Sequence, residues 1–248
     1  MKKNTQKLLV ALYSDVSQIK NRVPVPHLQM LVPELSGGGF RSLLFALKKQ
    51  GVITTQKALG VTTVSITHHG SIHLESEFPA LSQKWDKWQG NWDCLVFMES
   101  PSLDKQFRFL RNLLLSEGAV AINRGVYLSP GGFSDVVLKE CQNTYYSNVL
   151  LFSVEAWKLA TDASFMIEKY GLLDVAEALS GISSDVDRLL KKVVDRKRLT
   201  QSDKMSIHLV YDRVLDILLE DPGFCTLYFK EVESMKVSLL KLNSLISL

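Results

Sequence analysis

The stretch from Ser36 to Leu74 constrains the fold of this 248-residue chain more than any other part. Ser36 is suited to begin a helix. Four apolar residues at helical spacing follow it: Phe40, Leu43, Leu44 and Leu47. Gly51 ends the predicted helix, and two β-rich runs joined across residues 58–60 come next. A helix followed by a strand, a turn and a second strand is typical of a winged helix-turn-helix, which is a DNA-binding fold.

The opposite face of the predicted helix combines cations with an aromatic ring and a hydroxyl group. It consists of Arg41, Ser42, Phe45, Lys48 and Lys49. In a major groove, such cations reach phosphates or guanine edges, and apolar groups meet thymine methyl groups. Together with Lys57, expected to contact phosphate from the wing, these residues form the predicted DNA-reading surface. The alternative is a solvated helix face with one exposed phenylalanine.

Charge is distributed unevenly along the chain. Residues 1–78 carry nine Lys and Arg against four acidic residues, a net charge of +5, whereas the remainder carries 20 basic and 22 acidic residues, a net charge of −2. Neutralisation of phosphates supplies most non-specific DNA affinity. A polyanionic partner is therefore expected for the N-terminal segment.

The residues before Ser36 predict two further helices. Thr5 is a suitable N-cap for the first, whose apolar face consists of Leu8, Leu9, Leu12 and Val16. The prolines in residues 23–26 favour an extended turn, and a short second helix is expected at about 27–31. Three helices followed by two strands is the element order of a winged helix.

Two features of the N-terminal segment suggest other chemistry. Gly37-Gly38-Gly39 opens the predicted third helix, where free N–H groups could donate to a DNA phosphate, or where the glycines form a simple turn. No GKS or GKT follows, as a nucleotide P-loop requires. His68, His69 and His73 form a metal-like cluster, but no carboxylate or cysteine completes a ligand set. We therefore expect surface histidines, with no metal and no cofactor.

The middle of the chain alternates between strands and helices. Residues 79–91 are polar and aromatic and predict a linker that packs through Trp85 and Trp88. A strand–helix–strand–strand–helix–strand pattern then occupies residues 92–158, in segments 94–98, 103–116, 119–123, 125–129, 133–142 and 148–154. This βαββαβ order is typical of a ferredoxin-like domain.

The remainder of the chain is helical in pattern. Apolar spacing predicts helices at 172–194, 202–220 and 225–246. The chain is thus expected to be an α+β protein with a winged helix-turn-helix in residues 1–78, a linker in 79–91, a ferredoxin-like domain in 92–158 and a helical domain in 159–248. The helical domain would pack on the middle domain or on a second subunit.

Cysteine usage and hydropathy favour a cytoplasmic protein. Three cysteines lie far apart without metal-ligand spacing, which predicts reduced, buried thiols: Cys94, Cys141 and Cys225. Apolar runs such as Val149 to Phe152 are far shorter than the roughly 20 residues of a membrane span. The apolar stretch near the N-terminus is broken by Ser14 and Asp15, so neither a signal peptide nor a membrane contact is expected.

Several segments resemble the PaaX-like family of bacterial transcriptional regulators, the repressors of phenylacetic acid degradation. The family's recognition helix is similar to FRSLLFALKKQGVI (residues 40–53), and its wing is similar to VSITHHGSIHL (64–74), which includes a threonine-x-x-glycine turn. Its central domain resembles WQGNWDCLVFMESPSLDKQFRFLRNLLLSEGAVAINRGVYLSP (88–130). Asp221-Pro222 resembles a family turn but lacks the leucine-proline continuation.

This resemblance implies a non-enzymatic, sequence-specific repressor. Members bind double-stranded DNA, so we expect a homodimer on a roughly palindromic operator, associated with the nucleoid in the cytoplasm. The family's effectors are aryl- or acyl-CoA thioesters, and the resemblance therefore implies release from DNA by an acyl-CoA-like small molecule.

Two alternatives remain open. The central domain is also similar in outline to the small ferredoxin-like nucleases of CRISPR spacer acquisition, which end their first strand with an aspartate. Here a metal-dependent nuclease would have to use Glu99 and Asp93, and its cleavage would disappear in Glu99→Gln. The other alternative is an interaction adaptor whose winged helix does not contact DNA, which predicts no salt-sensitive DNA affinity.

Overall fold

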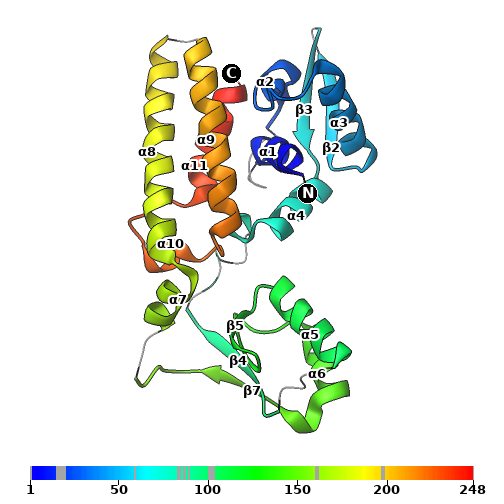
Figure 1. Cartoon of the computed structure of the whole chain (residues 1–248), viewed down its shortest axis with the longest axis vertical. Helices are drawn as coiled ribbons and strands as arrows, with labels where there is room; N and C mark the ends of the chain where they lie inside the picture. The colour runs from blue at the N-terminus through cyan, green and yellow to red at the C-terminus, as the bar shows by residue number, and fades with distance from the viewer. Residues whose placement is uncertain are drawn as a thin grey trace. The chain divides into compact units, whose positions relative to one another are not determined.

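The chain divides into two compact units in a computed structural model (Figure 1). Unit 1 combines residues 1–82 with 166–248, and unit 2 consists of 83–165. The structure describes residues 2–14, 21–58, 60–82, 85, 88, 90–99, 104–159, 162–196 and 199–247. The chain is an α+β protein with two antiparallel sheets, as expected.

Unit 1 is mainly helical and contains one small sheet. Its N-terminal elements are α1 (Lys3–Ala11), β1 (Val23–Pro24), α2 (Val25–Gln29), α3 (Gly37–Lys49), β2 (Ile53–Ala58), β3 (Val61–Ile66), α4 (His68–Glu77) and the 3-10 helix η1 (Pro79–Leu81). Its C-terminal elements are α8 (Leu172–Arg196), α9 (Gln201–Glu220), α10 (Cys225–Tyr228) and α11 (Met235–Ser247). α7 (Asp162–Tyr170) precedes them. The sheet order is β1-β3-β2, with Thr55 opposite Val64.

The N-terminal and C-terminal segments of unit 1 share one core. α1 packs against α9 and α11, and its Leu8, Leu9 and Leu12 are fully buried (Figure 1). The sequence analysis assigned residues 1–78 and 159–248 to separate domains, whereas the structure joins most of both segments in one unit. An amphipathic helix shows in its sequence that one face is buried, but not which distant helix covers that face.

Some predicted element boundaries are wrong. α1 begins at Lys3, so Thr5 lies inside the helix and is not its N-cap. α2 begins at Val25, before the predicted start, because Pro26 occupies the first turn, where a missing N–H costs nothing. The predicted helix at 225–246 is two helices, α10 and α11. The predicted wing strand is β3, and α4 occupies the segment that follows it, from His68 onward. Val16, Leu59, Leu103 and parts of the linker 79–91 lie outside the described residues.

Unit 2 contains a four-stranded antiparallel sheet. Its elements are β4 (Trp92–Phe97), α5 (Lys105–Ser116), β5 (Val120–Asn123), β6 (Val126–Pro130), α6 (Asp135–Tyr145), the 3-10 helix η3 (Tyr146–Asn148) and β7 (Val149–Val154). The strand order is β5-β6-β4-β7. Leu95, Phe97 and Tyr127 of the sheet share a core with Phe107 of α5 and Val137 of α6, so these helices cover one face.

The aromatic residues of the predicted linker pack within unit 2. The Trp85 and Trp88 rings meet edge to face with centroids 5.9 Å apart, and Trp88 meets Trp92 of β4 at 4.6 Å. Trp88 also donates its indole N–H to the Asn91 carbonyl. Separately, none of the helices in the described ranges combines the length and apolar character needed to cross a membrane.

Candidate nucleic-acid interface

α3 is fixed to unit 1 by one apolar face. The hydroxyl of Ser36 accepts from the Gly39 N–H at 3.2 Å, which confirms Ser36 as the N-cap. Phe40 and Leu47 are buried, whereas Leu43 and Leu44 of the predicted stripe are only partly buried. Because the apolar face holds the helix against its neighbours, the opposite face is presented to solvent.

Thr67 connects the end of α3 to the start of α4. Its hydroxyl accepts from the Gly70 N–H at 3.0 Å and donates to the carbonyl of Gly51 at 2.6 Å. Gly51 has a positive φ of 72°, which glycine adopts without strain. The threonine-x-x-glycine feature is therefore an N-cap of α4 that also holds the turn leaving α3 in place.

The predicted reading residues on α3 are all exposed. They are Arg41, Ser42, Phe45, Lys48 and Lys49. Phe45 is 71% exposed, although burial is the usual state of a phenylalanine ring. Across residues 2–14, 21–58 and 60–82 and the other described ranges, no carboxylate forms an ion pair with Arg41, Lys48, Lys49 or Lys57. Their positive charge is thus directed to solvent.

The hairpin brings Lys57 to the α3 side of the sheet. Lys48 donates its ammonium group to the Thr55 hydroxyl of β2 at 3.0 Å. Side chains two residues apart leave a strand on the same face, so Lys57 projects on the same side as Thr55. Thr55 is not among the residues predicted from the sequence, although its spacing of two from Lys57 in a β-rich run was the available signal.

Gly37, Gly38 and Gly39 form the first turn of α3. All three are exposed. A Cβ atom at Gly38 would come near only the Ser36 hydroxyl, at 3.9 Å. Because the Gly39 N–H already donates to the Ser36 hydroxyl, the N–H groups of Gly37 and Gly38 are the ones in this turn that could donate to an anion.

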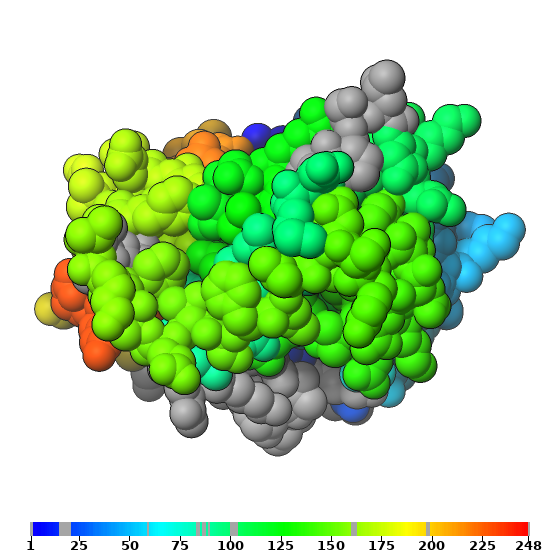
Figure 2. Space-filling view, turned by 90° about the horizontal axis from the view of Figure 1, so that it is seen from below, coloured from blue at the N-terminus to red at the C-terminus, as the bar shows by residue number. Residues whose placement is uncertain are grey.

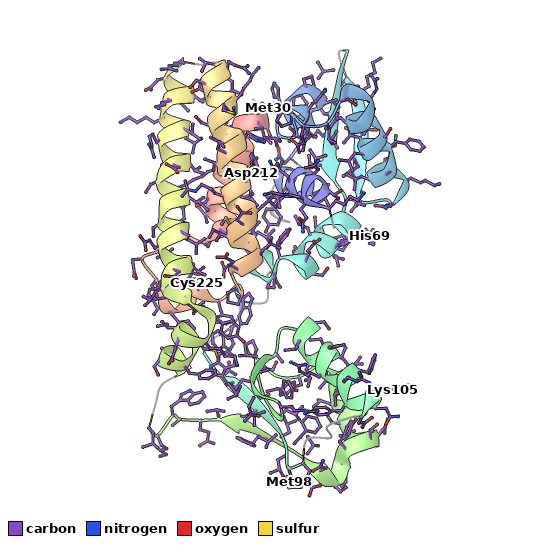
Figure 3. The ribbon with its side chains drawn as sticks, in the orientation of Figure 1. Met30, His69, Met98, Lys105, Asp212 and Cys225 are labelled. Atoms are coloured by element: carbon purple, nitrogen blue, oxygen red, sulfur yellow. The ribbon has the colours of Figure 1, made fainter. Side chains whose placement is uncertain are left out.

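Other candidate residues do not assemble into a common site. His68, His69 and His73 lie on α4 and are exposed, as expected for surface histidines; Figure 3 labels His69. Among the described residues, no group of three His, Cys, Asp or Glu is placed to hold a metal ion. Asp93 is the second residue of β4, whereas Glu99 lies two residues beyond the other end of this strand.

The three cysteines are buried and not disulfide-bonded, as predicted. Burial raises the pKa of Cys94, and it raises the pKa of Cys141 to about 11 and that of Cys225 to about 12. These thiols stay protonated at neutral pH, so they lack the thiolate that a nucleophile or metal ligand needs.

Comparison with known proteins gives no activity for the chain. No protein-family profile and no curated protein matches it. A solved structure described as the uncharacterized protein Rv0674 from Mycobacterium tuberculosis is similar at 16% identity, covers 97% of each chain and gives a TM-score of 0.47. Its description names no activity, ligand or partner.

Proposed function

We propose that the chain is a transcriptional regulator that binds double-stranded DNA through α3. In this proposal α1, α2, α3 and the β2–β3 hairpin form a winged helix-turn-helix, and α3 enters the major groove. The observation that carries the proposal is the exposed face of α3, where cations without a carboxylate partner surround the exposed Phe45 ring.

Each residue of this face has a distinct expected contact. Arg41 and Ser42 lie in the N-terminal half of α3, from which recognition helices reach base edges. Phe45 would meet a thymine methyl group, and Lys48, Lys49 and Lys57 would pair with phosphates. The bare N-terminus at Gly37 and Gly38 would admit one more phosphate close to the backbone.

In the proposal, unit 2 is a ferredoxin-like scaffold, and the whole chain is a PaaX-like repressor. The strand order β5-β6-β4-β7 and the βαββαβ connections of unit 2 support a ferredoxin-like scaffold. The resemblance of residues 40–53 and 88–130 to PaaX-like regulators favours a cytoplasmic, nucleoid-associated repressor released by an acyl-CoA-like effector.

The proposed homodimer would form through the β7 edge of unit 2. Leu150, Leu151 and Phe152 are each about half exposed, and no residue of β7 is charged. Figure 2 shows the yellow-green residues of this part of the chain at the surface. The opposite edge strand, β5, is interrupted by a register shift, one of the devices that protect an edge, whereas β7 pairs regularly over its whole length.

A second copy is the occupant that suits this edge. Two β7 strands related by a two-fold axis would pair antiparallel, and an uncharged strand meets its own copy without repulsion. Leu151→Lys should convert the dimer to a monomer in analytical ultracentrifugation, while Leu115→Lys on α5, of similar exposure, should leave it dimeric. A monomeric wild type at tens of micromolar would contradict the β7 interface.

DNA binding is tested on the full chain with sites selected from random duplexes, measured at two salt concentrations. We expect Arg41→Ala to weaken binding to the selected site about tenfold or more, since a good base contact contributes roughly 1–3 kcal/mol of discrimination between bases. Lys48→Ala should weaken binding to all DNA sequences alike. It should also reduce by about one the slope of the logarithm of the affinity against the logarithm of the salt concentration. The exposed Lys230→Ala serves as control, with melting temperatures unchanged throughout.

The outcomes of this experiment are separable. Wild-type protein without salt-sensitive DNA affinity would overturn the function and favour the adaptor. DNA binding that is equal in Arg41→Ala, Lys48→Ala and wild type would keep the function but reject the α3 face.

A further inference from the structure

A pocket of about 290 Å³ lies between α8 and α9 in unit 1. Its lining comes from one face of each helix, with residues spaced by three and four positions on both. Asp185, Arg188, Leu189 and Lys192 belong to α8, and Val210 and Arg213 to α9. All of its lining residues belong to unit 1.

The pocket carries an excess of positive charge. Three cations line it against one carboxylate, Asp185, which leaves a net charge of +2. Asp185 forms ion pairs with both Arg188 and Arg213 and so holds a guanidinium group from each helix in place. A guanidinium has five N–H donors, and one carboxylate leaves several of them available to a ligand. Lys192 lies one turn beyond Arg188 and completes the cationic rim.

Beneath this rim the pocket is apolar. Leu189 and Val210 are each 6% exposed and form part of its floor. Polar groups on the rim fix an anionic head, and an apolar floor accepts a hydrocarbon body. The volume is at the lower end of small-molecule sites, which span roughly 300–1,000 Å³. The pocket therefore suits a short or single-ring organic anion better than a nucleotide-sized one.

Gly181 leaves room for Arg213 beside α8. A Cβ atom at Gly181 would lie 3.1 Å from the Arg213 Nη2 atom. Glycine inside a helix costs about 1 kcal/mol relative to alanine, and here it lets the arginine lie across the helix. Arg213 also borders a second, more open hollow lined by Asp174 and Glu177, whose carboxylates make that hollow unfavourable for an anion.

We propose that the α8–α9 pocket binds a small organic anion, a carboxylate or phosphate monoester with an apolar body. Side chains of α8 and α9 alone carry this inference, so it does not depend on the proposed DNA binding. The cationic groups would contact the head, with Arg188 and Arg213 as planar donors and Lys192 as a point charge.

Phenyl phosphate is a suitable probe, titrated calorimetrically into the full chain without DNA. We expect saturable binding of one molecule per chain, with weaker binding of inorganic phosphate or phenol alone. Lys192→Gln and Arg188→Gln should each weaken it about tenfold or more, as expected for lost hydrogen bonds to a charged group. Lys191→Gln, an exposed neighbour outside the pocket, should bind like the wild type.

A second set of variants separates ligand contact from folding. Lys192→Arg keeps the charge and should retain binding, whereas Leu189→Ala should weaken phenyl phosphate more than inorganic phosphate. Melting curves identify any variant that fails to fold. If Arg188→Gln does not fold, Lys192→Gln still tests the proposal, because Lys192 is exposed. Non-saturating titrations, or equal affinity in Lys191→Gln and Lys192→Gln, would overturn the proposal.

Discussion

The backbone around Gly70 leaves almost no room for a side chain. A Cβ atom there would lie 2.1 Å from the Val52 carbonyl oxygen and 2.8 Å from the Ile66 Cγ1 atom. The Val52 carbonyl also accepts from the Thr67 N–H at 2.9 Å, so it cannot move without breaking the connection between α3 and α4.

We therefore predict that Gly70→Ala destabilises the protein by about 2–3 kcal/mol or more, as overpacking against a fixed neighbour does. Urea unfolding measures the change. Gly38→Ala is the matched control, because its Cβ would meet only the Ser36 hydroxyl, at an ordinary contact distance of 3.9 Å, and alanine favours a helix. Equal unfolding midpoints for Gly70→Ala and wild type would show that the turn can shift.

At the scale of elements, α9 joins the N-terminal segment to the C-terminal helices. Lys7 of α1 is buried, and its ammonium group lies 2.6 Å from Asp212 Oδ1 and 3.5 Å from His208 Nδ1 on α9. The same His208 nitrogen is 3.1 Å from the Leu31 carbonyl, beyond α2. Figure 3 labels Asp212 on α9. This cluster links α9 to two segments that support α3.

Asp212→Asn should cost about 3 kcal/mol of stability, because it leaves the buried Lys7 ammonium without its counter-charge. Asp216→Asn, one turn further along α9, should cost less than about 1 kcal/mol, since Asp216 and its partner Lys3 are both largely exposed. Thermal unfolding of both variants measures the two losses of stability. If the two losses were similar, the Lys7–Asp212 pair would contribute no more than an ordinary surface ion pair.

The start of α9 makes a contribution to the stability of the fold that depends on pH. Thr200 and Asp203 form a capping box, and hydrogen bonds from Thr200 lower the pKa of the Asp203 carboxyl below its usual value. A carboxyl whose folded pKa lies below its unfolded value of about 4 stabilises the fold above that pH. The contribution is then lost as pH falls through the folded pKa.

Asp203→Ala should therefore lower the free energy of unfolding by about 1 kcal/mol at pH 7. The difference from the wild type should shrink below about pH 4. Urea unfolding at pH 7 and at pH 3 measures it. Asp195→Ala, exposed on α8, controls for the general loss of a carboxylate. A difference that is the same at both pH values would mean that Asp203 acts through packing, not through its charge.

The position of a single helix or strand was easier to predict from the sequence than its contacts with other elements. The spacing around Phe40 and the cap at Ser36 place α3 correctly and predict the exposure of Phe45, because helix periodicity is a local property. The pairing of Asp185 with both Arg188 and Arg213 could not be predicted, because it depends on how α8 lies against α9. The break between α10 and α11 was missed because apolar spacing continues across it.

At the scale of the molecule, unit 1 is assembled from two separate parts of the chain. Asn243 of α11 donates to the carbonyls of Val10 at 3.1 Å and Tyr13 at 2.9 Å, and accepts from the Tyr211 hydroxyl at 2.5 Å. These bonds are buried and tie both parts together. Unit 2, by contrast, has a continuous sequence and its own core.

A fragment of residues 1–82 should therefore lack cooperative unfolding, since it would expose the wholly buried face of α1 at about 1.5–3 kcal/mol per large apolar side chain. A fragment of residues 83–159 should unfold cooperatively. Circular dichroism in increasing urea compares the two. A sharp transition in the N-terminal fragment would show that α1 needs no cover from α9 and α11.

The interrupted path of unit 1 also sets an order for its assembly on the ribosome. Unit 2 can fold as soon as residue 165 has emerged, whereas α1 must wait until α9 and α11 have been made. During that interval the apolar face of α1 is available to chaperones. A premature stop between α8 and α11 would release a protein with a complete middle unit and an N-terminal segment that has no core to join.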